Sequence, residues 1–306
     1  MAALEGLARV EDPAVSQAPG VFASFFGPDP LNLLGVVILT SLGTWGLPQM
    51  VQKFYAIKSE NAVHKGMIIS TVFALVVSGG CYFLGGFGRL FGDQVDVAAQ
   101  GYDAIIPTML SGLPDLLIAI VVILVLSASM STLSSLVLAS SSTLTLDFLK
   151  EKVCPDMSDR QQVTVMRLLV VVFIAISVVL AIIQYRSNVT FIAQLMGVSW
   201  GALAGAFLAP FLFGLYWKKT TKAACAVSFF FSTVVMLANI GLNDLFPPIL
   251  QSPINAGAFC MLAGLIIVPL VSLFTRKPDA ALVDEAFSCY DQRVLVRQRE
   301  ALGDSE

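Results

Sequence analysis

The chain has 306 residues, of which 57% are hydrophobic and only 13% are charged, and its mean hydropathy is +0.82. Because soluble domains carry roughly a quarter charged residues, this composition excludes an ordinary soluble domain and indicates an all-α membrane protein. We expect the lipid bilayer as a partner and no nucleic acid. The net charge of −3 adds nothing on orientation, because the placement of basic residues sets membrane topology.

Seven charge-free apolar runs are long enough, or nearly long enough, to cross a membrane as helices. A helix needs about 20 mostly apolar residues to span the hydrocarbon core. The third run is longer than this, so we expect it to tilt or to extend beyond the bilayer face. The runs cover residues 31–52, 66–88, 116–146, 168–185, 189–217, 223–243 and 254–275.

The basic residues predict the orientation of these spans. If the first span enters from outside, the inner segments are 53–65, 147–167, 218–222 and everything after Thr275. These segments hold fifteen of the eighteen basic residues, and only Arg9, Arg89 and Arg186 remain outside. The positive-inside rule then places the N-terminus outside and the C-terminus in the cytoplasm. We expect a multi-pass protein of the plasma membrane.

This topology divides the chain into three regions. We expect an extracytoplasmic segment over residues 1–30, a transmembrane core over 31–275 and a cytoplasmic tail over 276–306. The first region contains no secretory signal that would carry it across a membrane, so we expect further sequence upstream of Met1. Residues 105–110 predict a short helix in an outer loop, and alternating apolar and charged residues predict a short amphipathic helix in the tail.

A cluster of hydroxyl side chains, SASMSTLSS, occupies residues 127–135 in the middle of the third run. Facing lipid, it would cost free energy, so it should face protein, water or an ion. Ala128, Ser131 and Thr132 stand at positions i, i+3 and i+4, which places a carbonyl and two hydroxyls on one helix face. Oxygen atoms are the ligands that hard monovalent cations favour. The alternative is that these hydroxyls bond their own helix backbone or allow helices to pack closely.

The first run contains residues that weaken a helix. Gly43, Gly46 and Pro48 lie inside it, and proline removes a backbone hydrogen bond. A broken helix here would offer free backbone groups to a ligand near the middle of the membrane. The side chains that would line the gap are Thr40, Thr44, Trp45 and Gln49. The alternative is a simple proline kink in a packed helix.

Three stretches resemble the sodium:solute symporter family. Residues 46–58, GLPQMVQKFYAIK, resemble the broken sixth core helix and its basic inner end. Residues 128–132, ASMST, are similar to the sodium-site segment of the eighth core helix. Residues 205–222, from GAFLAP to LYWKKTTK, resemble the tenth core helix and its inner loop.

The resemblance implies a partial LeuT-type inverted-repeat transporter fold. It implies that sodium entry is coupled to the uptake of a small organic solute, with sodium as the transported coupling ion. By this resemblance the Ala128 carbonyl and the hydroxyls of Ser131 and Thr132 would bind sodium, and the span from Leu31 would line the solute site. Proline-transporting members carry aromatic residues at the positions that align with Thr40 and Thr44, so the resemblance does not point to proline.

The family has further helices before the first stretch, including the first core helix, which supplies other sodium ligands. The resemblance therefore covers the C-terminal part of such a transporter, and a separate polypeptide carrying the missing N-terminal helices is one expected partner. The alternative function is a non-transporting membrane subunit or an inactive product of a split gene. We expect no enzyme, because no predicted span contains an Asp, Glu or His to act as a base or metal ligand.

Overall fold

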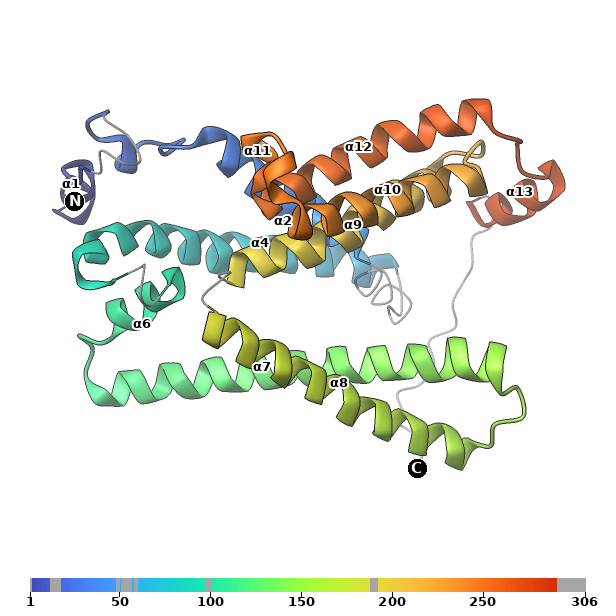
Figure 1. The fold of residues 1–306 in the computed structure, drawn as a ribbon, viewed down its shortest axis with the longest axis horizontal. Helices are drawn as coiled ribbons and strands as arrows, with labels where there is room; N and C mark the ends of the chain where they lie inside the picture. The colour runs from blue at the N-terminus through green and yellow to red at the C-terminus, as the bar shows by residue number, and fades with distance from the viewer. Residues whose placement is uncertain are drawn as a thin grey trace. The chain divides into compact units, whose positions relative to one another are not determined.

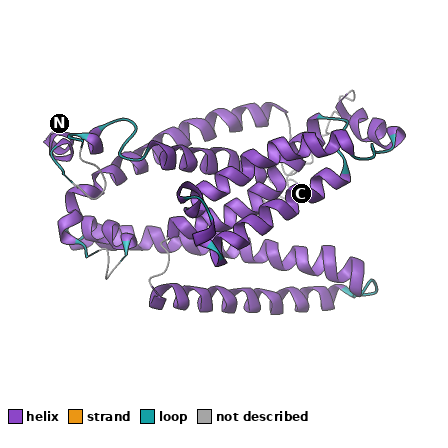
Figure 2. Cartoon of the chain, turned by 45° about the horizontal axis from the view of Figure 1, so that its top comes forward, coloured by secondary structure: helices purple, strands orange, loops and turns teal. Residues whose placement is uncertain are grey.

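The computed structural model describes residues 2–11, 18–47, 50, 57, 60–96, 101–187 and 192–290. These residues form helices joined by loops, and no strand occurs among them (Figures 1 and 2). The chain divides into two compact units, one of Met1–Leu90 with Ile192–Glu306 and the other of Phe91–Phe191. The prediction of an all-α protein is confirmed.

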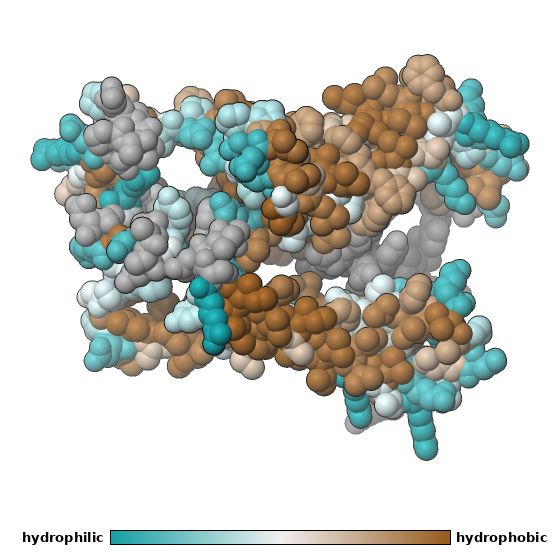
Figure 3. Space-filling model, viewed as in Figure 1, coloured by the Kyte–Doolittle hydropathy of each residue, from teal (hydrophilic) through white to brown (hydrophobic). Residues whose placement is uncertain are grey.

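Six helices in the described part of the chain are long and apolar enough to cross a membrane. They are α4 (Glu60–Gly86), α7 (Asp115–Thr143), α8 (Asp159–Ser187), α9 (Ile192–Tyr216), α10 (Lys222–Gly241) and α12 (Pro253–Phe274). A shorter apolar helix of 17 residues, α2 (Pro30–Gly46), lies in the first predicted run. The chain is thus a multi-pass membrane protein, and each of the seven apolar runs corresponds to one helix. In Figure 3 hydrophobic surface covers α12 and the α7–α8 pair.

Two helices begin well before the apolar runs that predicted them. The second run begins at residue 66 but α4 begins at Glu60, and the fourth begins at 168 but α8 begins at Asp159. Hydropathy marks only the apolar part of a helix, whereas backbone hydrogen bonding continues over its polar end. The predicted short helix at 105–110 is present as α6 (Ile105–Leu110), and α13 (Ala280–Phe287) lies in the predicted tail.

Helix α2 has clear start and stop signals. The Asp29 carboxylate caps its N-terminus, accepting a hydrogen bond of 3.0 Å from the Asn32 N–H, and Pro30 occupies the first helical position. The helix ends at Gly46, and Leu47 is extended, with φ −86° and ψ 115°. A residue that precedes a proline is driven away from the helical conformation, and Leu47 precedes Pro48. The continuous helix of the first apolar run therefore ends at Gly46, and Met50 is again helical. Pro48 lies outside the described residues.

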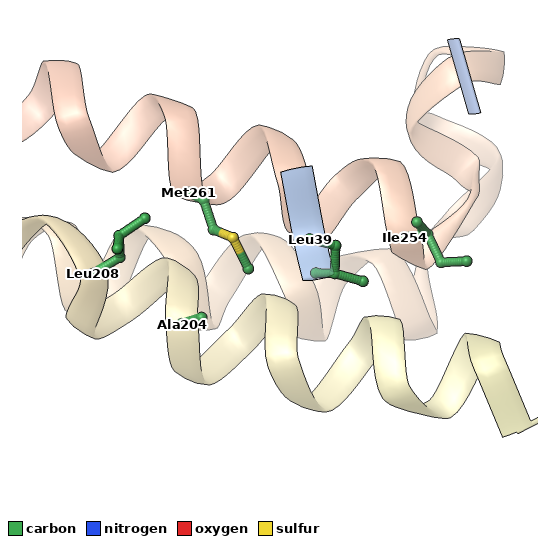
Figure 4. Close-up of a cluster of buried hydrophobic side chains, with 5 residues drawn as sticks. All are labelled: Leu39, Ala204, Leu208, Ile254 and Met261. Carbon is green, nitrogen blue, oxygen red and sulfur yellow. The ribbon is translucent and has the colours of Figure 1, made fainter. Parts of the chain in front are cut away.

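Helices α2, α9, α10 and α12 pack together in the first unit. Buried side chains from α2, α9 and α12 meet in one cluster: Leu39, Ala204, Leu208, Ile254 and Met261 (Figure 4). Helix α10 packs against both α9 and α12. This bundle fixes the position of α2, on which the predicted solute-binding residues lie.

Glycines allow these helices to approach closely. A Cβ atom added to Gly201 of α9 would lie 2.6 Å from the Cα of Gly257 on α12, and one added to Gly46 would lie 2.8 Å from the Cα of Ala204. In a membrane, lipid is as apolar as the helix surface, so helices associate through close packing of small residues. Gly46 of the first run and Gly201 of the fifth run are therefore part of the packing interface.

In the second unit α7 packs against α8. Helix α7 continues without a break into a π-helical segment, Leu144–Val153, so the whole helical stretch Asp115–Val153 has 39 residues. This length is about twice what a membrane span requires. The candidate cation-binding residues lie near the middle of the α-helical part.

Candidate functional site

The three residues predicted to bind a cation lie on consecutive turns of α7. The Ser131 hydroxyl donates a hydrogen bond to the Ala128 carbonyl oxygen, with 3.0 Å between Oγ and O. Thr132 follows at the next position, and its carbonyl accepts a bond of 2.9 Å from the Ser135 hydroxyl. The local geometry therefore brings the Ala128 carbonyl and the Ser131 hydroxyl together, as their spacing predicted.

The Thr132 hydroxyl differs from the hydroxyls around it. Ser134, Ser140 and Ser141 each donate to the carbonyl four residues earlier in α7, over 2.7 to 2.9 Å. Among the described residues the Thr132 hydroxyl has no hydrogen-bond partner. The alternative reading, in which hydroxyls bond their own helix backbone, thus describes Ser131 and its neighbours but not Thr132.

All three candidate residues are exposed in their unit. The side chains of α7 that are buried, Val137 and Ser141, lie closer to its C-terminal end. A free hydroxyl in the middle of a membrane-length helix is costly in contact with lipid. This face of α7 is consequently suited to contact an ion, water or another helix.

The residues predicted to line a solute site lie on α2, apart from Gln49, which falls outside the described residues. The Thr40 hydroxyl donates to the Val36 carbonyl over 2.8 Å, and the Thr44 hydroxyl to the Ser41 carbonyl over 3.1 Å. Trp45 is 61% exposed, because the opposite face of α2 packs into the bundle. Thr40 and Thr44 are one helical turn apart and so share a face.

The two sets of residues belong to different units. Ala128, Ser131 and Thr132 lie in the unit Phe91–Phe191, whereas Thr40, Thr44 and Trp45 lie in the other. Their assignment to one transport pathway therefore stays a prediction. Among the described residues there is no group of three or more His, Cys, Asp or Glu side chains that could hold a metal ion.

The polar groups inside the bundle were not predicted from the sequence. Ser228 and Ser232 of α10 are completely buried, and neither hydroxyl has a hydrogen-bond partner in the part of the chain that the structure describes. Asn239 is also buried, and its amide donates to the Leu250 carbonyl over 2.7 Å. The sequence signal for this pair is the spacing of four residues between two serines in an apolar run, because that spacing places both on one helix face.

A pocket of about 410 Å³ lies where α2 and α12 begin. Its polar lining comes from Asp29, Asn32, Ser252 and Asn255. The side-chain oxygens of Asn32 and Asn255 are buried, and neither has a hydrogen-bond partner among the residues that the structure describes. These residues stand at helix starts, where polar side chains are common as caps, so the sequence alone does not distinguish them from capping residues.

Comparison with known proteins points to one family. Residues 22–229 match the model of the sodium:solute symporter family. The chain is 28% identical over 279 residues to the high-affinity proline transporter PutP of Bacillus subtilis, covering 87% of this chain and 54% of the relative. It is 26% identical over 288 residues to the sodium/glucose cotransporter of Vibrio parahaemolyticus, covering 87% of this chain and 52% of the relative.

A third relative is the sodium/proline symporter of Staphylococcus aureus, 28% identical over 269 residues, which cover 82% of this chain and 50% of the relative. The chain spans about half the length of these curated relatives. No solved structure matches it.

Proposed function

The chain belongs to the sodium:solute symporter family, and from this premise we propose that it forms part of a transporter that couples sodium entry to the uptake of a small organic solute. The family consists of transporters and not of enzymes. The relatives are named for proline and for glucose, which are both small organic solutes. This supports the solute class but does not select one member of it.

The observation that carries the proposal is the Thr132 hydroxyl, which has no hydrogen-bond partner among the described residues and lies beside the bonded pair of Ala128 and Ser131. A hydroxyl has one donor hydrogen and two acceptor lone pairs. Because Ser131 uses its hydrogen to bond Ala128, its lone pairs remain available to a cation, and the Ala128 carbonyl keeps a second lone pair. The hydrogen bond between these residues is therefore compatible with sodium binding by all three.

These three oxygens are too few to bind a sodium ion alone. An ion taken out of water needs most of its hydration shell replaced, because burying an uncompensated charge is very costly. We infer that the remaining ligands come from a helix outside these 306 residues, which cover about half of the relatives. The missing helix would also cover the exposed face of α7.

We place the solute site at the end of α2. The last carbonyl groups of a helix have no partner within it, so the end of α2 at Gly46 offers backbone acceptors that a solute could use. Thr40, Thr44, Trp45 and Gln49 are the side chains proposed to line this site.

We propose that the transporter lies in the plasma membrane with the N-terminus of the chain outside. Three inner connections would then carry most of the basic residues, which the positive-inside rule favours. Lys152 lies at the end of the π-helical segment that follows α7, and Arg160 lies in the first turn of α8. Lys218 and Lys219 lie in the turn between α9 and α10. The tail from residue 276 would be cytoplasmic.

The test is uptake of radioactive sodium into vesicles that contain the chain together with a polypeptide that carries the earlier helices of the family. We expect one solute among a panel of amino acids and sugars to stimulate sodium uptake, and a sodium gradient to drive uptake of that solute. Solute uptake that is equal in sodium and potassium gradients would contradict sodium coupling.

A further inference from the structure

Five basic side chains gather at one end of the bundle formed by α9, α10 and α12. They lie just after α9 ends at Tyr216, at the start of α10, and just after α12 ends at Phe274. We call them the basic cluster: Lys218, Lys219, Lys222, Arg276 and Lys277. All five are exposed.

Buried hydrogen bonds hold these chain segments together. The hydroxyls of Thr221 and Thr275 lie 2.6 Å apart, and the Thr221 N–H donates to the Ser272 hydroxyl over 3.3 Å. Thr221 and Ser272 are almost completely buried. Lys222 and Arg276 directly follow the two bonded threonines in the chain, so the two basic segments are fixed next to each other.

The tail helix α13 folds back onto this end of the bundle (Figure 1). The Asp284 carboxylate of α13 pairs with Lys218, with 3.0 Å between Oδ1 and Nζ, and the Lys218 ammonium lies 5.5 Å from the centre of the Phe287 ring. Just beyond α13, the Tyr290 hydroxyl donates to the Leu215 carbonyl over 2.9 Å. Within the described residues, α13 thus pairs with the cluster at Lys218.

Among the described residues, most of the positive charge of the cluster has no acidic partner. Of its members, only Lys218 forms an ion pair within the part of the chain that the structure describes. This pair is itself exposed, with 57% of the Lys218 side chain and 71% of the Asp284 side chain accessible. Exposed ion pairs contribute little stability, so another anion can replace Asp284 at small cost.

The position of the cluster indicates which anion it meets. Helices α9, α10 and α12 have membrane-spanning length, so their ends lie at the bilayer surface. Tyr216 and Trp217 are next to Lys218, and such aromatic residues favour the membrane–water interface. Basic residues at this depth attract anionic lipid headgroups, by an amount that grows with each Lys or Arg.

We propose that the basic cluster binds the headgroups of anionic phospholipids and that the tail helix α13 competes with them through Asp284. A headgroup phosphate and the Asp284 carboxylate use the same Lys218 ammonium, so each weakens the binding of the other. Anionic lipid therefore loosens α13 from the end of the bundle. The proposal requires only that the bundle is inserted in a membrane, and it is independent of the transported solute.

Fluorescence quenching of Trp217 by brominated lipids tests the proposal. The chain, with Trp45→Phe and Trp200→Phe to leave Trp217 as the reporter, is reconstituted in mixed bilayers of phosphatidylcholine and phosphatidylglycerol. Either the neutral or the anionic lipid is brominated. We expect stronger quenching by the brominated anionic lipid, and we expect high salt to reduce this excess because it screens exposed charges.

Two sets of variants separate the parts of the proposal. Replacing Lys219, Lys222, Arg276 and Lys277 with Gln should reduce the excess of anionic lipid near Trp217. The loss of one Lys or Arg corresponds to about a fivefold reduction, so the loss of all four should reduce the excess by at least this factor. Asp284→Asn should increase the excess, whereas Glu285→Gln, which removes the same charge from α13 without freeing Lys218, should change it less. Equal quenching of Trp217 in every variant, in bilayers of brominated phosphatidylcholine alone, shows that the bundle is inserted alike.

Equal quenching of Trp217 by the two brominated lipids would overturn the proposal. If the excess of anionic lipid near Trp217 were the same in the parent protein, in Asp284→Asn and in Glu285→Gln, the proposed competition between α13 and lipid would be wrong.

Discussion

The Ser131 hydroxyl and the Ala128 carbonyl oxygen of α7 are hydrogen-bonded over 3.0 Å, and the neighbouring Thr132 hydroxyl has no partner among the described residues. Of the three proposed ligands, Thr132 is thus the one whose side chain does nothing else in its own helix. Removing its hydroxyl should therefore affect sodium binding with little effect on α7.

We predict that Thr132→Ala in the complete transporter raises the sodium concentration needed for half-maximal uptake. Loss of one ligand should cost about 1 to 3 kcal/mol, which corresponds to roughly a 5- to 150-fold increase. Uptake of solute as a function of sodium concentration measures this directly.

Two variants control for this experiment. Ser140→Ala removes a hydroxyl that bonds the Leu136 carbonyl in the same helix, and it should have a smaller effect on the sodium requirement. Thr132→Ser keeps the hydroxyl and should retain most of the sodium affinity. Identical sodium dependence in the wild type and in Thr132→Ala would refute the assignment of this residue.

A second prediction concerns helix packing. In Gly201→Ala the new Cβ would lie 2.6 Å from the Cα of Gly257, which forces α9 and α12 apart. Overpacking of this kind should cost about 1 to 3 kcal/mol in the free energy of unfolding. Unfolding of the purified protein in mixed micelles with increasing denaturing detergent, followed by circular dichroism, gives this quantity.

The matched control is Gly214→Ala in the same helix. No atom lies within 4 Å of a Cβ at Gly214, so the substitution should be neutral or stabilise α9 by about 0.5 to 1 kcal/mol, since glycine weakens a helix relative to alanine. If the two substitutions had equal effects, close packing of Gly201 against Gly257 would not contribute to stability.

A third prediction concerns topology. Single cysteines at positions 96 and 244, in place of Asp96 and Asp244, should react with a membrane-impermeant thiol reagent added outside cells. Single cysteines in place of Lys150 and Lys219 should react only after the membrane is opened. The five native cysteines must first be replaced, because Cys81, Cys154 and Cys289 are exposed. Reaction of the cysteine at position 219 in intact cells would show that the proposed orientation is inverted.

Features that depend on neighbouring residues in the chain could be predicted from the sequence. The run 223–243 closely matches α10 (Lys222–Gly241), because a membrane-length helix follows from uninterrupted apolar residues. The Ser131–Ala128 hydrogen bond also follows from helical spacing. The end of α2 at Gly46 follows from the proline two residues later, which restricts Leu47.

Features that depend on distant parts of the chain could not be predicted. The sequence contains 23 glycines, and nothing local shows that Gly201 meets Gly257. The Lys218–Asp284 pair joins residues 66 positions apart, and its formation depends on how α13 folds back. The buried Ser228 and Ser232 were missed for the same reason, because hydropathy does not tell which face of α10 packs against α9 and α12.

The central claim is that Ala128, Ser131 and Thr132 supply part of a sodium site that is completed by helices outside this chain. Solute uptake driven by a sodium gradient tests it most directly, in vesicles that contain either purified residues 1–306 alone or the same chain with the earlier helices of the family. We predict no sodium-driven uptake by the chain alone, because three oxygens cannot replace the hydration shell of the ion, and sodium-driven uptake when the other helices are present. Robust sodium-dependent uptake by residues 1–306 alone would contradict this account.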